Sequence, residues 1–314
     1  MLESFLVAFN AVMPLLILLG IGYGAVRLKL TDRPFMDRLN ATNFRLFFPF
    51  LMFNNIYNAK PEDLPSAALM AGAPAAILLL IAVLLLLVPR VVKENPRRGV
   101  IIQAIFRSNF VIYGLPLALS VFGPESSSVT GVMVLIMVSL FNIASVVVLE
   151  CFRDGGQVKF TSLLLGVLKN PLLQGCLVGL LFFALRIRLP EMIAKPIATL
   201  ASMASTLGLI TLGAALRFDE IRRNRREITV VLVIRLVLLP LTALFIGWLI
   251  GLRGIELFLV LMIYGTPIAT ASYPMAQNMG GDGQLAGQLV FISTVFSLAT
   301  IFCFIFGLSQ LGLI

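Results

Sequence analysis

Two copies of one five-residue pattern, Ile-Tyr-Gly-x-Pro, contain residue types that can create a binding site in a helical protein. They occupy residues 112–116 and 263–267, 151 positions apart. Proline lacks the N–H that a helix interior requires and glycine weakens helices, so each copy can interrupt a helix. A half-helix that begins after such a break presents free N–H groups, which attract anions. Each copy therefore predicts an anion-binding break, although glycine and proline can also merely kink a packed helix.

Polar side chains near the two copies add candidate ligands. Asn109 lies five residues before Gly114 and carries a donor and an acceptor, so in an apolar segment it must bind either substrate or backbone. The hydroxyls of Tyr113 and Tyr264 either donate to a ligand or bond to a backbone carbonyl. The predicted substrate-binding residues are Arg45, Asn54, Arg107, Asn109, Tyr113, Gly114, Leu115, Pro116, Tyr264, Gly265, Thr266, Pro267 and Ser272.

Basic residues lie inside otherwise apolar segments, whereas no acidic residue lies near the middle of one. The four basic residues are Arg45, Arg107, Lys169 and Arg235. Charges inside a membrane are candidates for function, and basic groups alone favour an anionic substrate. A competing interpretation is that these long side chains extend to the membrane surface. On a regular helix Arg107 and Asn109 would point in different directions, because residues two apart do not share a face.

The composition is that of an integral membrane protein. Hydrophobic residues make up 59% of the 314 residues, charged residues 12%, and the mean hydropathy is +1.01. The lack of histidine excludes triads with a histidine base and H-E-x-x-H zinc motifs, and the three cysteines are too scattered for a metal cluster. We therefore predict no enzyme activity, no metal and no cofactor. The net charge of +9 comes mainly from Lys and Arg in the loops beside the membrane segments. There it indicates the orientation of the chain in the membrane and not nucleic-acid binding.

The elements that must position these residues are membrane-spanning helices. Ten apolar segments are long enough to cross a bilayer, which needs about 20 residues. We place them at 5–27, 36–58, 66–89, 98–122, 127–150, 161–185, 191–216, 228–250, 255–279 and 285–312. Alternate loops carry fifteen Lys and Arg residues on one side and five on the other. The positive-inside rule makes the richer side cytoplasmic, so both termini lie outside.

The two halves of the chain resemble each other, which predicts an internal repeat. Residues 14–16 and 171–173 both read Pro-Leu-Leu, and Arg-Leu-Lys-Leu at 27–30 matches Arg-Ile-Arg-Leu at 186–189, at offsets of 157 and 159. Five helices per half is an odd number, so the second half must be inverted relative to the first. The predicted division is 1–150 for the first repeat, 151–160 for a cytoplasmic linker and 161–314 for the second repeat.

These features resemble the auxin efflux carrier family, the bacterial relatives of plant PIN-formed auxin exporters. The resemblance covers the whole chain. It rests on Ser108-Asn109 before Gly114-Leu115-Pro116, on Phe122-Gly123, on a segment rich in proline and alanine that ends at Gly280-Gly281-Asp282, and on Ser293-Thr294. The chain departs from the family at Thr300-Ile301-Phe302, where a proline is often found late in the tenth helix.

The resemblance implies an all-α integral membrane fold of ten transmembrane helices, in two inverted five-helix repeats. Helices 4 and 9 would be broken and would cross inside a mobile transport domain, while helices 1, 2, 6 and 7 would form a scaffold that offers a homodimer surface. The implied protein is a multi-pass carrier of the bacterial inner membrane for small organic anions such as malate, malonate or auxin-like carboxylates. Its partners would be that anion and the lipid bilayer, with no nucleic acid, and Asn109 would contact the substrate.

The sequence leaves open two ways in which transport could be driven. A proton-coupled carrier usually needs a buried titratable group, and the chain has no histidine and no carboxylate in mid-segment. We therefore expect alternating access by potential-driven uniport or efflux, with a sodium-coupled organic-anion symporter of the bile-acid type as the alternative. A membrane enzyme is disfavoured because no nucleophile–base pair is present. A receptor is disfavoured because the longest predicted loop, 217–227, is too short for a signalling domain.

Overall fold

The computed structural model describes residues 2–58, 65–123, 126–153, 169–216 and 222–314, and their regular structure is helical. The elements are α1 (Leu2–Arg27), α2 (Arg33–Thr42), the π-helix η1 (Asn43–Phe47), α3 (Phe48–Tyr57), α4 (Ala67–Val91), α5 (Asn95–Phe106), α6 (Phe110–Phe122), α7 (Ser126–Cys151), α9 (Pro171–Ala184), α10 (Glu191–Ala215), α12 (Arg225–Val233), the π-helix η2 (Ile234–Leu238), α13 (Leu239–Leu249), α14 (Gly254–Gly265), α15 (Ser272–Asn278) and α16 (Gly283–Gln310). The predicted all-helical membrane fold is thus confirmed as to class.

Five helical stretches among the described residues are long and apolar enough to cross a membrane. They are Ala67–Val91, Val129–Cys151, Glu191–Ala215, Arg225–Leu249 and Gly283–Gln310. Shorter apolar helices include Pro171–Ala184 and Gly254–Gly265. The ten-span inverted repeat therefore stays a prediction, as does the division of the chain into two repeats. Most of the predicted linker, 151–160, lies outside the described residues.

The predicted fourth and ninth segments are each interrupted, but the first interruption is not where the sequence placed it. α5 ends at Phe106 and α6 begins at Phe110, whereas Gly114 lies inside α6, which continues to Phe122. The break expected at residues 114–116 is therefore wrong by several residues. A proline in a helix removes one hydrogen bond, and this does not by itself end the helix.

The second interruption does coincide with its pattern, so the two copies are not equivalent in the fold. Gly265 ends α14, and the chain stays non-helical or in turns until α15 begins at Ser272. α5 and α14 both have 12 residues, and their last residues, Phe106 and Gly265, are 159 positions apart. That offset equals the one between 27–30 and 186–189, whereas the five-residue pattern repeats at 151.

The two breaks pair with each other. The backbone N–H of Asn109 donates to the carbonyl of Pro267 at 2.8 Å, and the N–H of Ala269 donates to the carbonyl of Arg107 at 3.5 Å. Ser108 and Ile268 form an isolated antiparallel bridge. Inside a membrane, backbone groups released from a helix must find partners within the protein, and each break here supplies partners for the other.

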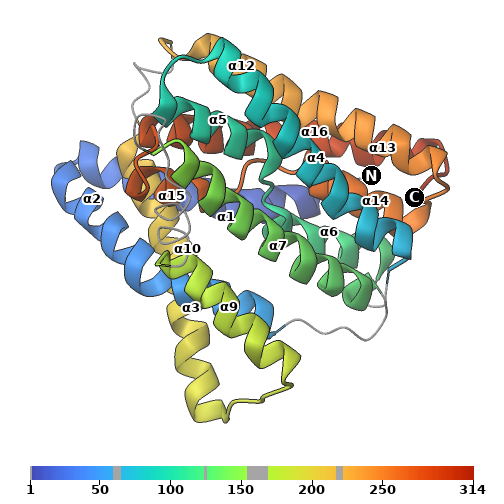
Figure 1. Cartoon of the computed structure of the whole chain (residues 1–314), viewed down its shortest axis with the longest axis horizontal. Coiled ribbons are helices and arrows are strands. Elements are labelled where there is room, and N and C mark those ends of the chain that lie inside the picture. Colours follow the sequence, from blue (N-terminus) through green and yellow to red (C-terminus); the bar gives the residue numbers. More distant parts are fainter. Residues whose placement is uncertain (1, 59–64, 124–125, 154–168, 217–221) are drawn as a thin grey trace.

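Helices from both halves of the chain mix in two packed groups. The α10 group comprises α1, α2, η1, α3, α9 and α10, in which α3 packs on α9, and α10 packs on α1, α2 and α3. The broken-helix group comprises α4 to α7 and α12 to α16, and α1 joins the two by contacting α6 and α16. In Figure 1, α3, α9 and part of α10 form a lobe at the bottom, while α4, α12, α13 and α16 lie together at the upper right.

Each π-helix lies just before a proline. η1 ends two residues before Pro49, and η2 ends two residues before Pro240. A proline in a regular α-helix collides with the carbonyl four residues earlier, and the wider π turn relieves that collision. The two π-helices differ in exposure at their arginines, since Arg45 is exposed and Arg235 is buried.

Glycines allow the backbones of the α10 group to approach closely. A Cβ atom added at Gly22 of α1 would overlap the backbone carbonyl of Ile210 in α10, and one added at Gly213 of α10 would overlap the carbonyl of Leu19 in α1. Small residues at a helix interface are the usual means of close packing in membranes, where lipid removes the hydrophobic drive for helix association. The α1–α10 interface therefore depends on these two glycines.

We expect Gly22→Ala to lower the thermal unfolding temperature of the detergent-solubilised protein by about 4 °C or more, because forced overlap in a packed interface costs on the order of 1–3 kcal/mol. Gly20→Ala on the same helix is the matched control, since nothing lies within 4 Å of a Cβ there. The control should keep or gain stability, because alanine favours helix over glycine. Equal losses in the two variants would contradict the proposed tight contact.

Candidate functional site

A cavity of about 190 Å³ lies at the paired breaks. Its walls come from α3, from both breaks, from the start of α6, and from α7 and α10. The lining residues are Leu51, Met52, Asn55, Arg107, Ser108, Asn109, Val111, Ile112, Val138, Phe141, Asn142, Ser205, Ala269, Thr270 and Ala271. The cavity thus has contributions from both the α10 group and the broken-helix group.

Arg107 supplies the positive charge of this cavity. Its side chain is 3% exposed, its Nη2 donates to Oδ1 of Asn142 at 2.7 Å, and its Nη1 contacts the sulfur of Met275. The amide nitrogen of Asn142 in turn contacts the sulfur of Met52. Arg107 is the one Lys, Arg, Asp or Glu among the described lining residues, so no carboxylate within them neutralises it. A buried cation with only an amide and a sulfur as partners favours binding of an anion.

Asn109 and Ser108 add unused polar groups beside that charge. Asn109 precedes α6, is 5% exposed, and its side-chain nitrogen has no hydrogen-bond partner among the described residues. The hydroxyl of Ser108 is also buried and has no partner within that part of the chain. Buried polar groups without partners are costly, and a bound ligand with acceptor oxygens would satisfy them.

Arg107 and Asn109 line the same cavity, contrary to the expectation from helix geometry. That expectation assumed a regular helix, but Arg107 has extended backbone angles (φ −86°, ψ 114°) and Asn109 is also non-helical (φ −86°, ψ 42°). In extended backbone, side chains two residues apart point to the same side. The unwound break is therefore what brings the charge and the amide together.

Two of the predicted ligands lie away from the cavity. Arg45 is exposed in η1 and is not among the lining residues. Asn54 accepts a hydrogen bond from Asn58, the residue directly after α3, and lines a different pocket. Its neighbour Asn55 lines the cavity. Adjacent residues on a helix point about 100° apart, so the sequence could identify the polar stretch but not the inward residue.

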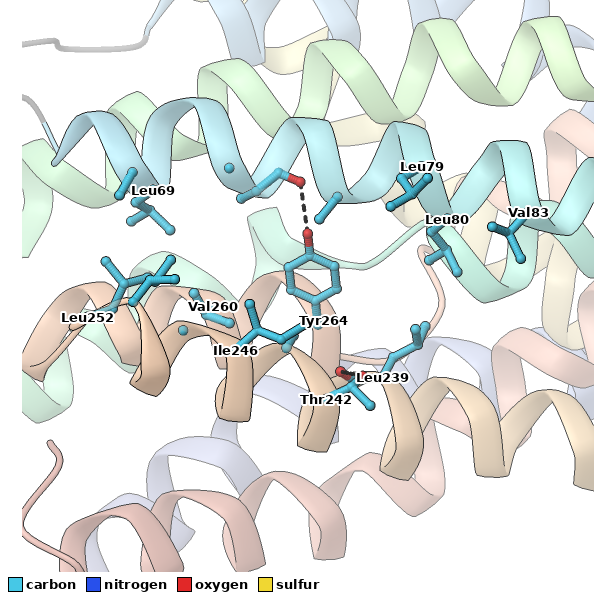
Figure 2. A pocket seen from close by; sticks show the side chains of 17 residues that line it. Leu69, Leu79, Leu80, Val83, Leu239, Thr242, Ile246, Leu252, Val260 and Tyr264 are labelled. Atoms are coloured by element: carbon cyan, nitrogen blue, oxygen red, sulfur yellow. Dashed lines mark hydrogen bonds between the residues drawn. The ribbon is translucent and has the colours of Figure 1, made fainter.

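Tyr264 bonds to backbone, which is one of the two roles that the sequence left open. Its hydroxyl donates to the carbonyl of Ala73 at 2.8 Å. Figure 2 shows this hydrogen bond crossing an apolar groove of about 360 Å³ between α4 and the α13–α14 pair. Tyr113 is fully buried in the core and does not line the cavity. Neither tyrosine therefore reaches the cavity beside Arg107.

The other predicted residues have backbone roles or lie at the edge of the site. The carbonyl of Pro267 holds Asn109, and the Thr266 hydroxyl donates to the carbonyl of Met262. A Cβ at Gly265 would press on Leu261 and Pro240, and Ser272 has a buried hydroxyl without a partner among the described residues. Gly114 lies buried within α6. The backbone of residues 115 and 116 is helical, but their side chains lie outside the described structure.

Several polar lining residues are not among the predicted ligands. Asn142 on α7, Asn55 on α3, and Ser205 on α10 contribute polar groups, and Thr270 belongs to the second break. Asn142 could have been found, because an amide inside an apolar segment is as costly there as Asn109 is. The positions of Asn55 and Ser205 depend on helix rotation, which only packing decides.

The family described as "Membrane transport protein" matches residues 7–305. The chain belongs to this family. It is the auxin efflux carrier family, so the resemblance noted in the sequence is confirmed. Its members are transporters rather than enzymes, and this chain is accordingly a membrane transporter. A comparison with curated proteins finds no match.

We expect Asn109→Ala to weaken binding of labelled malonate, used as a probe anion, by about tenfold or more, because a hydrogen bond to a charged group contributes roughly 1.5–3 kcal/mol. Asn54→Ala is the matched control, since this amide lies outside the cavity. Scintillation proximity binding to the purified protein would measure both. Unchanged affinity in Asn109→Ala would remove this residue from the site.

Proposed function

We propose that the protein is a carrier of small organic anions that works by alternating access. The observation that carries this proposal is the cavity at the paired breaks, with Arg107 as its charge and no carboxylate among its described lining residues. Breaks in two helices are where substrate sites of secondary transporters are commonly built. The moving part would be the broken-helix group, and the α10 group would serve as the scaffold and offer a homodimer surface.

Helix geometry adds to the attraction for an anion. Asn109, Val111 and Ile112 all line the cavity, so the beginning of the 13-residue α6 lies against it. The N-terminus of a helix carries a partial positive charge and attracts carboxylates. This dipole and the Arg107 guanidinium act in the same direction, and burial strengthens both because little water screens them.

The size of the cavity favours a small substrate. About 190 Å³ is below the roughly 300–1,000 Å³ of pockets that hold drug-sized ligands. A dicarboxylate such as malate or malonate suits a space of this size better than an auxin-like aromatic carboxylate does. One carboxylate would bind Arg107, and the amides of Asn109 and Asn142 would hydrogen-bond its oxygens.

The same residues favour potential-driven transport. The described lining residues include no carboxylate and no histidine. None of them is therefore a side chain of the kind that usually carries the proton in a proton-coupled carrier. An anion leaving a negative interior gains roughly 2.3 kcal/mol per charge per 100 mV, which is enough to drive efflux. A sodium-coupled organic-anion symporter remains the second candidate. The family resemblance supports a place in the bacterial inner membrane, and the distribution of lysine and arginine in the loops supports both termini lying outside.

The test is uptake of labelled malate and malonate into proteoliposomes under an imposed inside-positive potential. We expect potential-driven uptake in the absence of sodium. Arg107→Gln should reduce it by about a hundredfold, because loss of a buried charge partner costs roughly 3 kcal/mol or more. Arg45→Gln is the matched control, since that arginine also lies in a predicted span but is exposed.

Three results would count against parts of this proposal. Uptake only in the presence of sodium would favour the symporter. Equal activity in Arg107→Gln and wild type would exclude this cavity as the anion site. Failure to take up any small carboxylate, with protein correctly inserted, would reject the substrate class.

A further inference from the structure

A second arginine is buried at the paired breaks. Arg235 lies in η2, is 0% exposed, and is the largest of the fully buried side chains among the described residues. It does not line the cavity that contains Arg107. A buried charge without compensation costs several kcal/mol, so its partners must account for its presence.

Its partners are backbone carbonyls from both broken helices. Nε and Nη2 donate to the carbonyl of Thr266 at 3.1 and 2.9 Å, and Nη2 also donates to the carbonyl of Ile263 at 3.2 Å. Nη1 donates to the carbonyl of Ile105 at 3.2 Å. One guanidinium therefore connects the end of α14 with the end of α5.

These carbonyls form a site of negative potential. Ile105 belongs to the last turn of α5, Ile263 to the last turn of α14, and Thr266 follows α14 directly. The C-terminus of a helix carries a partial negative charge from carbonyls without helical partners, and two such ends meet here. None of the ion pairs found within the described residues involves Arg235. Carbonyl oxygens thus provide the compensation that a carboxylate would usually provide.

Carbonyl oxygens of this kind are also ligands for cations. In transporters with discontinuous helices, unwound carbonyls and C-terminal ends of half-helices coordinate the coupling sodium ion or proton. Here the oxygens of Ile105, Ile263 and Thr266 already accept hydrogen bonds from a cation that belongs to the chain. A planar guanidinium suits this task better than an ammonium, because its rigid fork can serve two helices at once.

We propose that Arg235 is a built-in cation, which fills the carbonyl site at the two breaks and makes a coupling cation unnecessary. Arg235 is a positioning residue: it holds the ends of α5 and α14 together, and it leaves Arg107 and Asn109 to the substrate. The inference that transport is independent of sodium rests on the proposed carrier function. That a cation occupies the carbonyl site does not depend on the proposed carrier function, so it can be tested separately.

The first test measures thermal unfolding of the detergent-solubilised protein and needs no transport. In Arg235→Ala the carbonyl site is vacated, so millimolar guanidinium chloride should raise the unfolding temperature by about 2–4 °C through binding to the folded state. Wild type should not gain stability, because its own guanidinium occupies the site. Arg45→Ala, which removes the exposed arginine of η1, is the matched control and should not respond either.

The same variants are then compared in proteoliposomes with labelled malonate. We expect Arg235→Ala to lose about tenfold or more of its flux, and guanidinium, or sodium as a smaller cation, to restore part of it. Arg235→Lys and Arg235→Gln extend the comparison where the alanine variant does not accumulate, because only lysine retains a charge that can reach the carbonyls. Lysine should support more flux than glutamine.

The outcomes separate this inference from the proposed function. Wild type that takes up no malonate, together with guanidinium stabilisation of Arg235→Ala, would count against the proposed substrate class and still support the cation site. No response of Arg235→Ala to guanidinium or sodium, in either assay, would overturn the cation site. Equal flux in the lysine and glutamine variants would do the same, and strict sodium dependence of wild-type flux would overturn the sodium independence.

Discussion

The structure depends on the pairing of two unwound segments. Backbone groups released from a helix inside a membrane have no water to bond, so a break persists only where protein supplies partners. Here the N–H of Asn109 bonds to the carbonyl of Pro267, and the N–H of Ala269 bonds to that of Arg107. Each break thus supplies the hydrogen-bond partners that the other break needs. The cavity, the position of Arg107 and the site of Arg235 all follow from this pairing, because all three use backbone that a continuous helix would have hidden.

The two buried arginines lie at opposite kinds of helix end: Arg235 lies at two C-terminal ends, and Arg107 lies beside an N-terminal end. Arg235 is surrounded by carbonyls at the C-terminal ends of α5 and α14, so its charge is compensated within the protein. Arg107 has an amide and a sulfur as side-chain partners beside the start of α6, where the helix dipole adds further positive potential. A positive site that the fold leaves uncompensated attracts an anion, whereas a compensated one fixes structure. Two buried arginines of one protein therefore have opposite roles.

The α10 group supplies a fixed surface for this arrangement. α1 meets α10 at Gly22 and Gly213, and a Cβ at Gly175 of α9 would likewise overlap the backbone of Pro49 at the start of α3. Backbone contact of this kind leaves little freedom to slide, since rigid main chain and not flexible side chains forms the interface. In the broken-helix group, by contrast, hydrogen bonds between short non-helical segments hold the centre. This contrast between a close-packed wall and an interrupted core fits the proposed mechanism of alternating access.

The sequence by itself determined the class of fold, the family, the presence of two interrupted helices, and Arg107 and Asn109 as candidate ligands. Hydrophobicity and the cost of buried polar groups act locally, so they can be read residue by residue. Only the tertiary structure decided where the first break lies, that Asn55 rather than Asn54 faces the cavity, and that Arg235 binds carbonyls from two helices. Each of these depends on partners distant in sequence. The first break lies at 107–109 because the second break provides hydrogen bonds there, and no local preference of the chain records that contact.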